Sequence, residues 1–363
     1  MKQLLASLYH DWQKWHKANA IYKLHLNLYK KIYAQCPELN IENPKEKEWL
    51  KIWKKYDKRV SVHSFRIFSK FIGDDMNIMP LEICANHVED ILTPQEYIGY
   101  YSDKNTLNQF IPNKYLPKVF LRNINGIYCG EDYKPIAPEQ AITSLNKLTD
   151  DKLIIKPTKE CSGRGVKLLR KEKGHYIDEN KQIVDLQYLQ NRYKRDFIIQ
   201  QCVHQCVSLA QFNPTSVNTI RIFTYRNHLG TIYPMHAVLR IGAKGASVDN
   251  AHSGGMFCGI DENGKLGKYC CSWLGERKTV FNDCDFANNE YIIPKYEEVK
   301  KFSIDIAERI PFQDLVAMDI AIDENLNPKL IEINVGGFGA WLFQFVVGAV
   351  FDPYTEEVMQ RCQ

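Results

Sequence analysis

The segment from Asp314 to Gly339, DLVAMDIAIDENLNPKLIEINVGGFG, constrains the fold more than any other part of the sequence. Two apolar runs, LVAMDIAI and KLIEINV, flank the six-residue segment DENLNP, which is rich in turn-forming residues. Because side chains of a strand alternate between its two faces, the pattern predicts an antiparallel hairpin with one apolar face. The residues predicted on this apolar face are Met318, Ile320, Ile331, Ile333 and Val335.

The other face of the predicted hairpin carries Asp319, Glu332 and Asn334, beside the small side chains Ala317 and Ala321. In a symmetric hairpin Asp319 lies opposite Glu332, with Cβ atoms roughly 5 Å apart. Opposed carboxylates destabilise a strand pair unless a positive group lies between them. Two carboxylates and an amide oxygen suit Mg²⁺, which also binds substrate phosphates. The alternative is a polar face that meets solvent, but the small residues that frame the acids favour a Mg²⁺–phosphate site.

Length and composition limit the classes of protein to which this chain can belong. A chain of 363 residues is too long for one ordinary core and predicts two or three domains. Its 47 basic and 43 acidic residues give a net charge of +4, without the basic excess typical of nucleic-acid binding, so no nucleic-acid partner is expected. The 11 cysteines are scattered, without disulfide-framework spacing. We find no signal-peptide pattern and no apolar window long enough to span a bilayer, and we expect a cytoplasmic location with reduced cysteines.

The chain divides by pattern into residues 1–72, 73–150, 151–205 and 206–363. The first part has a helical pattern, the second is mixed and punctuated by turns, and the last two are rich in strands. Helices are also predicted at 184–195, at 295–309 and at the C-terminus. The predicted strands are KLIIKP (152–157), GVKLLRK (165–171), DFIIQQCV (196–203), TIRIFTYR (219–226), TIYPMHAVLRIG (231–242) and GMFCGI (255–260).

Residues 1–72 are aromatic and basic. The helical spacing of Tyr9, Trp12, His16, Ile21 and Leu24 predicts an apolar stripe. We favour a helical pair that packs this stripe on the main body while its lysines face water. Contact with an anionic membrane surface or with a partner protein is the alternative.

The segment 153–169, LIIKPTKECSGRGVKLL, predicts a glycine-rich hairpin. It lacks the GxxxxGK[ST] pattern and leads into a strand, which excludes a Walker A loop. A hairpin of this kind can fold over phosphates, with backbone N–H groups as donors and a lysine that neutralises charge. The candidate phosphate-binding residues are Lys156, Ser162, Gly163, Arg164, Gly165 and Lys167.

The strand at 196–203 ends in a segment that suits contact with a nucleotide base, with Gln200, Gln201 and Val203 as candidates. It continues into CVHQC, whose Cys202, His204 and Cys206 share one face of an extended strand. Because no second Cys/His pair at zinc-like spacing is near, we interpret the cysteines as buried thiols.

Two further segments carry candidate functional residues. SVNTIRIFTYR places Asn218 and Arg221 at the start of a strand, where an arginine usually pairs with a carboxylate or a phosphate. Residues 240–261 are too rich in glycine and polar residues for a strand and are long for a connection, which indicates a functional loop. Its candidates, among which the histidine is a possible general acid or base or merely structural, are Arg240, Asp249, Asn250, His252, Gly254 and Gly255.

The order of these parts resembles the ATP-grasp superfamily and, more narrowly, the sugar-transfer-associated ATP-grasp family found with polysaccharide and capsule biosynthesis genes. The resemblance covers roughly residues 73–345 and includes SDKN at 102–105 and LP at 116–117. LIEINVGGFG is its most specific piece, because Glu-x-Asn is the metal-binding signature of the superfamily. The resemblance implies an α+β fold in which two subdomains, 151–205 and 206–363, grip ATP. Residues 73–150 would form a linking domain and 1–72 a helical extension.

The resemblance also implies roles for the candidate residues. Lys156 would contact the α- and β-phosphates, the Ser162–Gly165 loop would cover the triphosphate, and Gln200 to Val203 would line the adenine site. Arg221 and Arg240 would stabilise the transferred phosphoryl group or an acyl-phosphate. Mg²⁺ would be held by Asp319, Glu332 and Asn334.

The activity implied by the resemblance is that of a carboxylate–amine ligase, which uses ATP to form an acyl-phosphate and then an amide. The expected setting is the attachment of an amino acid or similar group to a sugar, with the 240–255 loop at the acceptor and glycan-assembly enzymes as possible partners. Two alternatives stay open: a kinase that phosphorylates a sugar hydroxyl, and a nucleotide-binding scaffold for glycosyltransferases.

Overall fold

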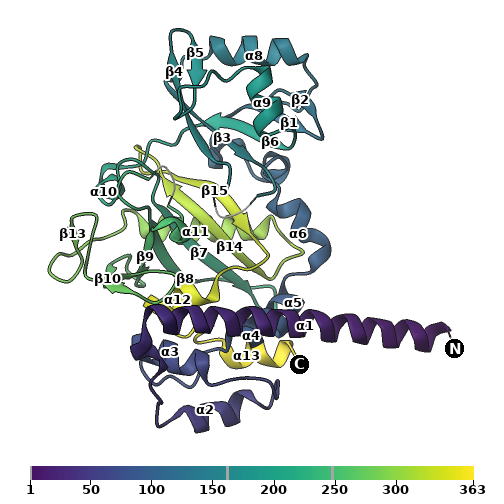
Figure 1. Ribbon diagram of the computed structural model, residues 1–363, viewed down its shortest axis with the longest axis vertical. Coiled ribbons are helices and arrows are strands. Elements are labelled where there is room, and N and C mark those ends of the chain that lie inside the picture. The colour runs from purple at the N-terminus through teal and green to yellow at the C-terminus, as the bar shows by residue number, and fades with distance from the viewer. Residues whose placement is uncertain (1, 161–162, 247–248) are drawn as a thin grey trace.

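The structure, a computed structural model, describes residues 2–160, 163–246 and 249–363. Figure 1 shows a small sheet with its helices at one end, a larger sheet in the middle and a layer of helices at the other end. Helices and antiparallel strands are mixed along the chain, which confirms the predicted α+β class.

The small sheet has the strand order β2-β1-β6-β3-β4-β5. Ile155 on β3 lies opposite Ile199 on β6, and both side chains are buried under α8 and α9. Lys156 and Gln200 alternate with them and turn to the opposite face. The sheet extends across the boundary expected between residues 150 and 151, because β1 and β2 come from the preceding part of the chain. Its elements are β1 (Val119–Ile124), β2 (Ile127–Cys129), α8 (Pro138–Lys147), β3 (Lys152–Pro157), β4 (Lys167–Glu172), β5 (His175–Ile177), α9 (Leu186–Arg192) and β6 (Phe197–Gln201).

The larger sheet has the strand order β11-β10-β9-β8-β7-β14-β15. On one face Ile222 and Met318 belong to a core that includes Phe302 and Ile306 of α11. On the other face Phe223 contacts Phe343 of α12. The strands are β7 (Thr219–Arg226), β8 (Ile232–Ile241), β9 (Met256–Ile260), β10 (Leu266–Cys271), β11 (Arg277–Lys278), β14 (Leu315–Ile322) and β15 (Pro328–Asn334). The accompanying elements are α10 (Val207–Ala210), η4 (Ala251–Ser253), β12 (Val280–Phe281), β13 (Cys284–Asp285), α11 (Tyr296–Glu308) and α12 (Ala340–Val346).

The β14–β15 hairpin confirms the central expectation from the sequence, since Asp319 lies opposite Glu332. The register then shifts, so that Ile320 pairs with Leu330 and not with Ile331. This bulge buries Leu330 in the core and leaves Ile331 on the face that carries Glu332. The prediction of Ile331 on the apolar face is therefore wrong.

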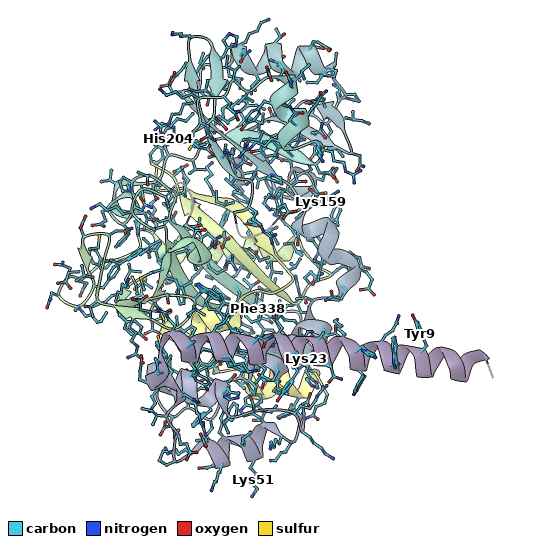
Figure 2. All side chains as sticks on the ribbon, in the orientation of Figure 1. Tyr9, Lys23, Lys51, Lys159, His204 and Phe338 are labelled. Atoms are coloured by element: carbon cyan, nitrogen blue, oxygen red, sulfur yellow. The ribbon has the colours of Figure 1, made fainter. Side chains whose placement is uncertain are left out.

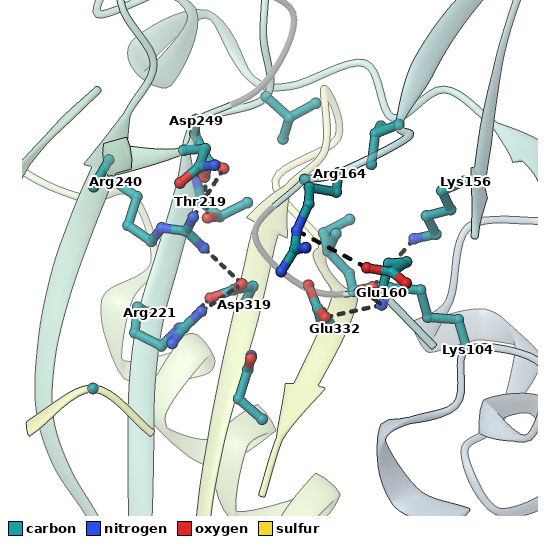
Figure 3. A pocket seen from close by; sticks show the side chains of 18 of the residues that line it. Lys104, Lys156, Glu160, Arg164, Thr219, Arg221, Arg240, Asp249, Asp319 and Glu332 are labelled. Carbon is teal, nitrogen blue, oxygen red and sulfur yellow. Dashed lines mark hydrogen bonds and ion pairs between the residues drawn. The ribbon is translucent and has the colours of Figure 1, made fainter. Parts of the chain in front are cut away.

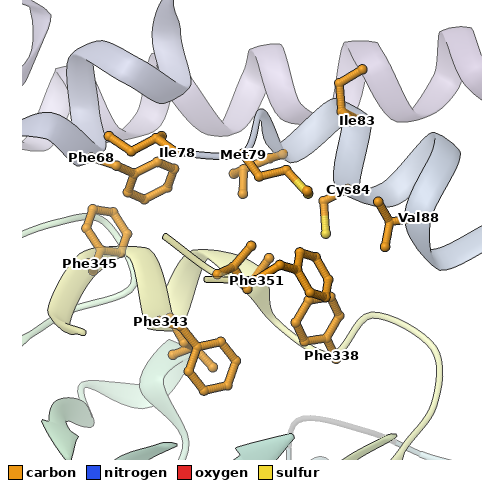
Figure 4. Packing of buried hydrophobic residues seen from close by; sticks show 14 of the residues in the cluster. Phe68, Ile78, Met79, Ile83, Cys84, Val88, Phe338, Phe343, Phe345 and Phe351 are labelled. Atoms are coloured by element: carbon orange, nitrogen blue, oxygen red, sulfur yellow. The ribbon is translucent and has the colours of Figure 1, made fainter. Parts of the chain in front are cut away.

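The helical layer combines both ends of the chain. Phe68 and Met79 of the N-terminal part face Phe345 and Phe351 of the C-terminal part, whereas Phe343 points to the sheet, and all are buried in one core (Figure 4). This layer and its connection to the small sheet comprise α1 (Lys2–Gln35), η1 (Pro37–Asn40), α2 (Glu46–Trp53), α3 (His63–Ile72), α4 (Leu81–Ile83), the π-helical turn η2 (Cys84–Val88), α5 (Glu89–Leu92), α6 (Gln95–Ser102), α7 (Leu107–Phe110), η3 (Asn113–Tyr115) and α13 (Thr355–Arg361).

Helix α1 is buried only in part. Tyr29 and Ile32, near its end, are in the core, whereas Tyr9 and Trp12 are 60% and 54% exposed. Figures 1 and 2 show the first half of α1, with Tyr9, extending beyond the rest of the molecule. The expectation that the apolar stripe packs on the main body is therefore wrong, because Tyr9 and Trp12 lie on the projecting part of α1, and Leu24, further along the helix, is 66% exposed. Among the described residues, no helix is long and apolar enough to cross a membrane.

Candidate active site

A cavity of about 370 Å³ lies between the two sheets. Its walls come from β3 and β6 of the small sheet, from β7, β8, β14 and β15 of the larger sheet, and from the segment 336–342. Most of the candidate residues meet here (Figure 3). Those that line the cavity are Lys156, Gly163, Arg164, Gln200, Gln201, Val203, Arg221, Arg240, Asp249, Asn250, Asp319, Glu332 and Asn334.

Asp319 is held by two arginines. Arg221 lies opposite it on β7, and its Nε and Nη2 donate to the two carboxylate oxygens, the latter at 2.9 Å. Arg240 of β8 donates from Nη1 to Oδ2 at 2.7 Å. Burial would raise the pKa of Asp319, but Arg221 and Arg240 outweigh burial and hold that pKa at about 2. The carboxylate is thus charged at neutral pH and fixes the direction of both guanidinium groups.

Arg240 has a second carboxylate neighbour in the 240–255 loop. Its Nη2 lies 3.4 Å from Oδ1 of Asp249. The other carboxylate oxygen, Oδ2, accepts hydrogen bonds from the backbone N–H and the hydroxyl of Thr219. Burial alone would lower the pKa of Arg240, but Asp249 and Asp319 raise it above its ordinary value. Burial raises the pKa of Asp249. The loop is therefore tied to β7 through Thr219 and to β8 through Arg240.

Glu332 is paired with Lys104, a residue that the sequence analysis did not assign to the site. Lys104 Nζ lies 2.9 Å from Glu332 Oε1, and its side chain is 7% exposed. The available signal was the SDKN segment, which contributed to the family resemblance but offered no reason to place Lys104 beside Glu332. The positive groups expected near the opposed carboxylates are thus protein side chains, with arginines at Asp319 and a lysine at Glu332.

Lys156 is buried and forms no ion pair with a carboxylate in the part of the chain that the structure describes. Its Nζ donates to the carbonyl oxygen of Ile331 at 3.4 Å. Burial, together with the neighbouring Lys104, lowers the pKa of Lys156 to about 8. An ammonium group held this loosely in a cavity is available to an anionic ligand. Apolar surface beside it comes from Ile154, Val203 and Ile331.

The donor set fits Mg²⁺ at the larger sheet. Glu332 and Asn334 follow each other on one face of β15, and Asp319 faces them on β14. The side-chain nitrogen of Asn334 is buried without a hydrogen-bond partner in the described structure. Exchanging the two ends of this amide would place an oxygen acceptor there, which a cation satisfies. Both oxygens of Asp319 accept from arginines, so Glu332 and Asn334 are the more accessible ligands.

Two candidate residues lie away from the cavity, so their predicted nucleotide contacts are corrected. Lys167 pairs with Ile155 across β3 and β4, shares its helix-covered face and lies 3.7 Å from Asp178. The buried amide of Asn218 donates to Gln205 Oε1 and to the carbonyl oxygen of Leu209. These hydrogen bonds hold the segment that precedes β7.

At the candidate glycines outside the cavity, the local backbone explains why the residue is a glycine. Gly165 has φ +71° and lies so close to Pro157 that a Cβ would approach it to 2.8 Å. A Cβ on Gly255 would lie 2.8 Å from the carbonyl oxygen of Asn250, and Gly254 has φ +85°. These residues shape the two loops and do not line the cavity.

Ser162 lies outside the described residues, and of His252 the structure describes only the backbone, in η4. Within the described ranges, no group of three or more His, Cys, Asp or Glu side chains could hold a metal ion. Of the cysteines interpreted as buried thiols, Cys206 is buried and Cys202 is half-buried.

Comparison with known proteins gives a match to one family model. The model for sugar-transfer associated ATP-grasp proteins matches residues 94–360. A search of the curated proteins finds no match. Similar solved structures include the D-cycloserine synthetase DcsG, at 10% identity and a TM-score of 0.44, over 75% of this chain and 74% of that one. The ATP-grasp ligase PsnB has 10% identity and a TM-score of 0.41, over 88% and 73%.

N5-carboxyaminoimidazole ribonucleotide synthetase from Thermotoga maritima is also similar, at 12% identity and a TM-score of 0.37. The match covers 73% of this chain and about half (49%) of the synthetase.

Proposed function

Since the chain belongs to the sugar-transfer associated ATP-grasp family, we propose that it is an ATP- and Mg²⁺-dependent carboxylate–amine ligase that forms an amide. The observation that carries this proposal is the concentration of cations around acidic and amide ligands in one buried cavity between two sheets. Among the described residues, the cations that line the cavity are Lys104, Lys156, Arg164, Arg221 and Arg240. Such a cavity suits a polyphosphate with its metal ion.

The nucleotide would lie between the sheets. Lys156 would bind its phosphates, with Arg164 at the exposed rim and Gly163 providing close backbone approach. The base would lie along Gln200 to Val203 against the apolar surface of Ile154 and Ile331. Glu332 and Asn334, beside Asp319, would hold Mg²⁺, which would supply positive charge to neutralise the phosphates.

Arg221 and Arg240 would stabilise the reaction centre. The terminal phosphoryl group of ATP passes to a substrate carboxylate and ADP leaves. An amine then attacks the acyl carbon, inorganic phosphate leaves and the nitrogen loses a proton. The phosphoryl group is negatively charged throughout, and Arg221 and Arg240, which Asp319 orients, would stabilise that charge.

The acceptor would occupy the end of the cavity formed by Asp249, Asn250 and Trp341. The family's association with sugar transfer supports a sugar or glycan precursor in polysaccharide or capsule biosynthesis, with an amino acid or similar group as the other substrate. A cytoplasmic location and contact with glycan-assembly enzymes or an anionic membrane surface belong to the same proposal. Exposed Tyr9, Trp12 and Trp15 on the projecting half of α1 support such a contact.

The test is release of ADP and phosphate with Mg²⁺–ATP, screened over free amino acids with and without nucleotide sugars. Release of both products that requires a particular amino acid, and is lost in Glu332→Gln, is the expected result. Glu357→Gln is the matched control, because Glu357 bonds Tyr225 far from the cavity. ADP with a phosphorylated sugar and no free phosphate would identify a kinase. Nucleotide binding without turnover would favour the scaffold.

A further inference from the structure

Lys104 connects three parts of the site. It lies between α6 and α7, and its backbone N–H donates to the carbonyl oxygen of Thr158 at 3.1 Å. Its Nζ lies 2.9 Å from Glu332 Oε1 and 2.9 Å from the carbonyl oxygen of Glu160. Figure 3 shows Lys104 reaching Glu332 from the side opposite Asp319. The ammonium therefore occupies a lone-pair position of the carboxylate that the proposed function assigns to Mg²⁺.

An ammonium and a divalent cation cannot share this carboxylate without cost. The Lys104 side chain is 7% exposed and that of Glu332 is 22% exposed, so water screens their charges poorly. A divalent cation at Glu332 would lie against the buried positive charge of Lys104. Lys104 can leave Glu332 more readily than the arginines can leave Asp319, because it makes a single contact with Glu332 and keeps the Glu160 carbonyl as an acceptor.

We propose that Lys104 is an internal counter-ion of Glu332 that a divalent cation must displace, so that the metal binds weakly until Lys104 moves. This inference rests on the metal site of the proposed function and adds a coupling to it. Nucleotide phosphates offer the displaced ammonium a new anionic partner. Metal and nucleotide should therefore each strengthen the binding of the other, by the same factor.

The experiment measures binding of Mn²⁺ to the whole protein by electron paramagnetic resonance, with and without ADP. Lys104→Met keeps an unbranched side chain and removes the charge, and it should bind Mn²⁺ about tenfold more tightly than wild type without ADP, within the usual range of such couplings. ADP should then improve Mn²⁺ affinity less in this variant than in wild type. Lys104→Arg, which keeps a cation, should bind no more tightly than wild type.

Lys159→Met is the matched control, because Lys159 is exposed and pairs with Asp196 outside the cavity (Figure 2). It should leave Mn²⁺ binding unchanged. Thermal melting checks that each variant is folded, and Lys104→Gln replaces Lys104→Met if the latter is not. Equal or weaker Mn²⁺ binding in the folded neutral variant overturns the counter-ion role but leaves the ligase proposal intact.

Glu332→Gln separates this inference from the function on which it rests. In the Lys104→Met background it should abolish the gain in Mn²⁺ affinity. If Glu332→Gln alone leaves Mn²⁺ binding with ADP unchanged, the metal is elsewhere, and both the metal assignment and the counter-ion role are wrong.

Discussion

Lys156 differs from Lys104, Arg221 and Arg240 because it forms no ion pair with a carboxylate among the described residues. With its pKa lowered to about 8, first by burial, it is charged at pH 7 and loses its proton as the pH rises above 8. Since only the charged form attracts phosphate, ADP affinity should fall by about tenfold between pH 7 and 9.5, as for loss of one charged hydrogen bond. Calorimetric titration across this range measures the fall. Lys156→Arg stays protonated and should bind ADP with little dependence on pH. An equal decline in this variant would assign the titration to another group.

Asp319 holds two buried guanidinium groups, and its removal should destabilise the fold. Asp319→Asn leaves Arg221 and Arg240 without their shared counter-charge and should lower the free energy of unfolding by about 3–5 kcal/mol, measured with urea. Because the pKa of Asp319 is lowered to about 2, this stabilisation is complete above pH 4 and should disappear as the pH falls through 2.

The matched change is Asp314→Asn, which breaks partly exposed pairs with Arg226 and Arg361 and should cost about 1 kcal/mol or less. Similar losses in the two variants would show that the arginines at Asp319 are not held by its charge.

Residue types and their order predicted much of the site, and residues distant in sequence supplied what was missing. Asp319, Glu332, Lys156, Arg221 and Arg240 meet in the cavity as expected. The pairing of Lys104 with Glu332 spans 228 positions, and no local pattern contains it. Lys167 and Asn218 were predicted to contact the nucleotide because of their residue types. Lys167 instead lies on the helix-covered face of its strand, and Asn218 donates to oxygen atoms of the protein.

At the scale of elements, the bulge in β15 places two adjacent apolar residues in different surroundings. Leu330 is fully buried, whereas Ile331 lines the cavity. Leu330→Ala should cost about 2–5 kcal/mol of stability, as buried leucines do, with little change in the ADP affinity of the folded protein. Ile331→Ala should cost less stability and weaken ADP binding several-fold, because it removes apolar surface beside the nucleotide. Urea unfolding and ADP titration of both variants test the register, and the reversed pattern would contradict it.

The strands were predicted from their apolar, β-branched and aromatic residues and from the turns that bound them, although β7 and β14 are buried on both faces. The strand expected at 219–226 is β7 in full, and the helix expected at 295–309 is α11, Tyr296–Glu308. The bulge was not predictable in the same way. Leu330 and Ile331 are both apolar, so either suits the core face, and only the positions of the surrounding side chains select between them.

At the scale of the whole molecule, the N-terminal helices form a base for the active-site sheet and are not a loose extension. Trp49, Phe65 and Phe68 share a core with Phe343 and Phe345, which follow the hairpin that carries the site. Helical periodicity predicted these helices but could not identify their partner, because an apolar stripe specifies burial and not what covers it. The same limit explains why the exposed part of α1 was expected to be buried.

The projecting half of α1 therefore provides a surface whose loss should leave the catalytic domains unaffected. Tyr9 stacks on Trp12 at 5.9 Å between ring centroids, and Trp12 and Trp15 are 54% and 58% exposed. Aromatic rings with lysines such as Lys23 on one helix suit the interface of an anionic membrane. The double substitution Trp12→Ser/Trp15→Ser should abolish co-sedimentation with phosphatidylglycerol vesicles and leave the melting temperature and ADP affinity unchanged. Neutral phosphatidylcholine vesicles are the control. Wild-type protein that sediments with neither vesicle would exclude the membrane contact and leave a protein partner as the explanation for the exposed rings.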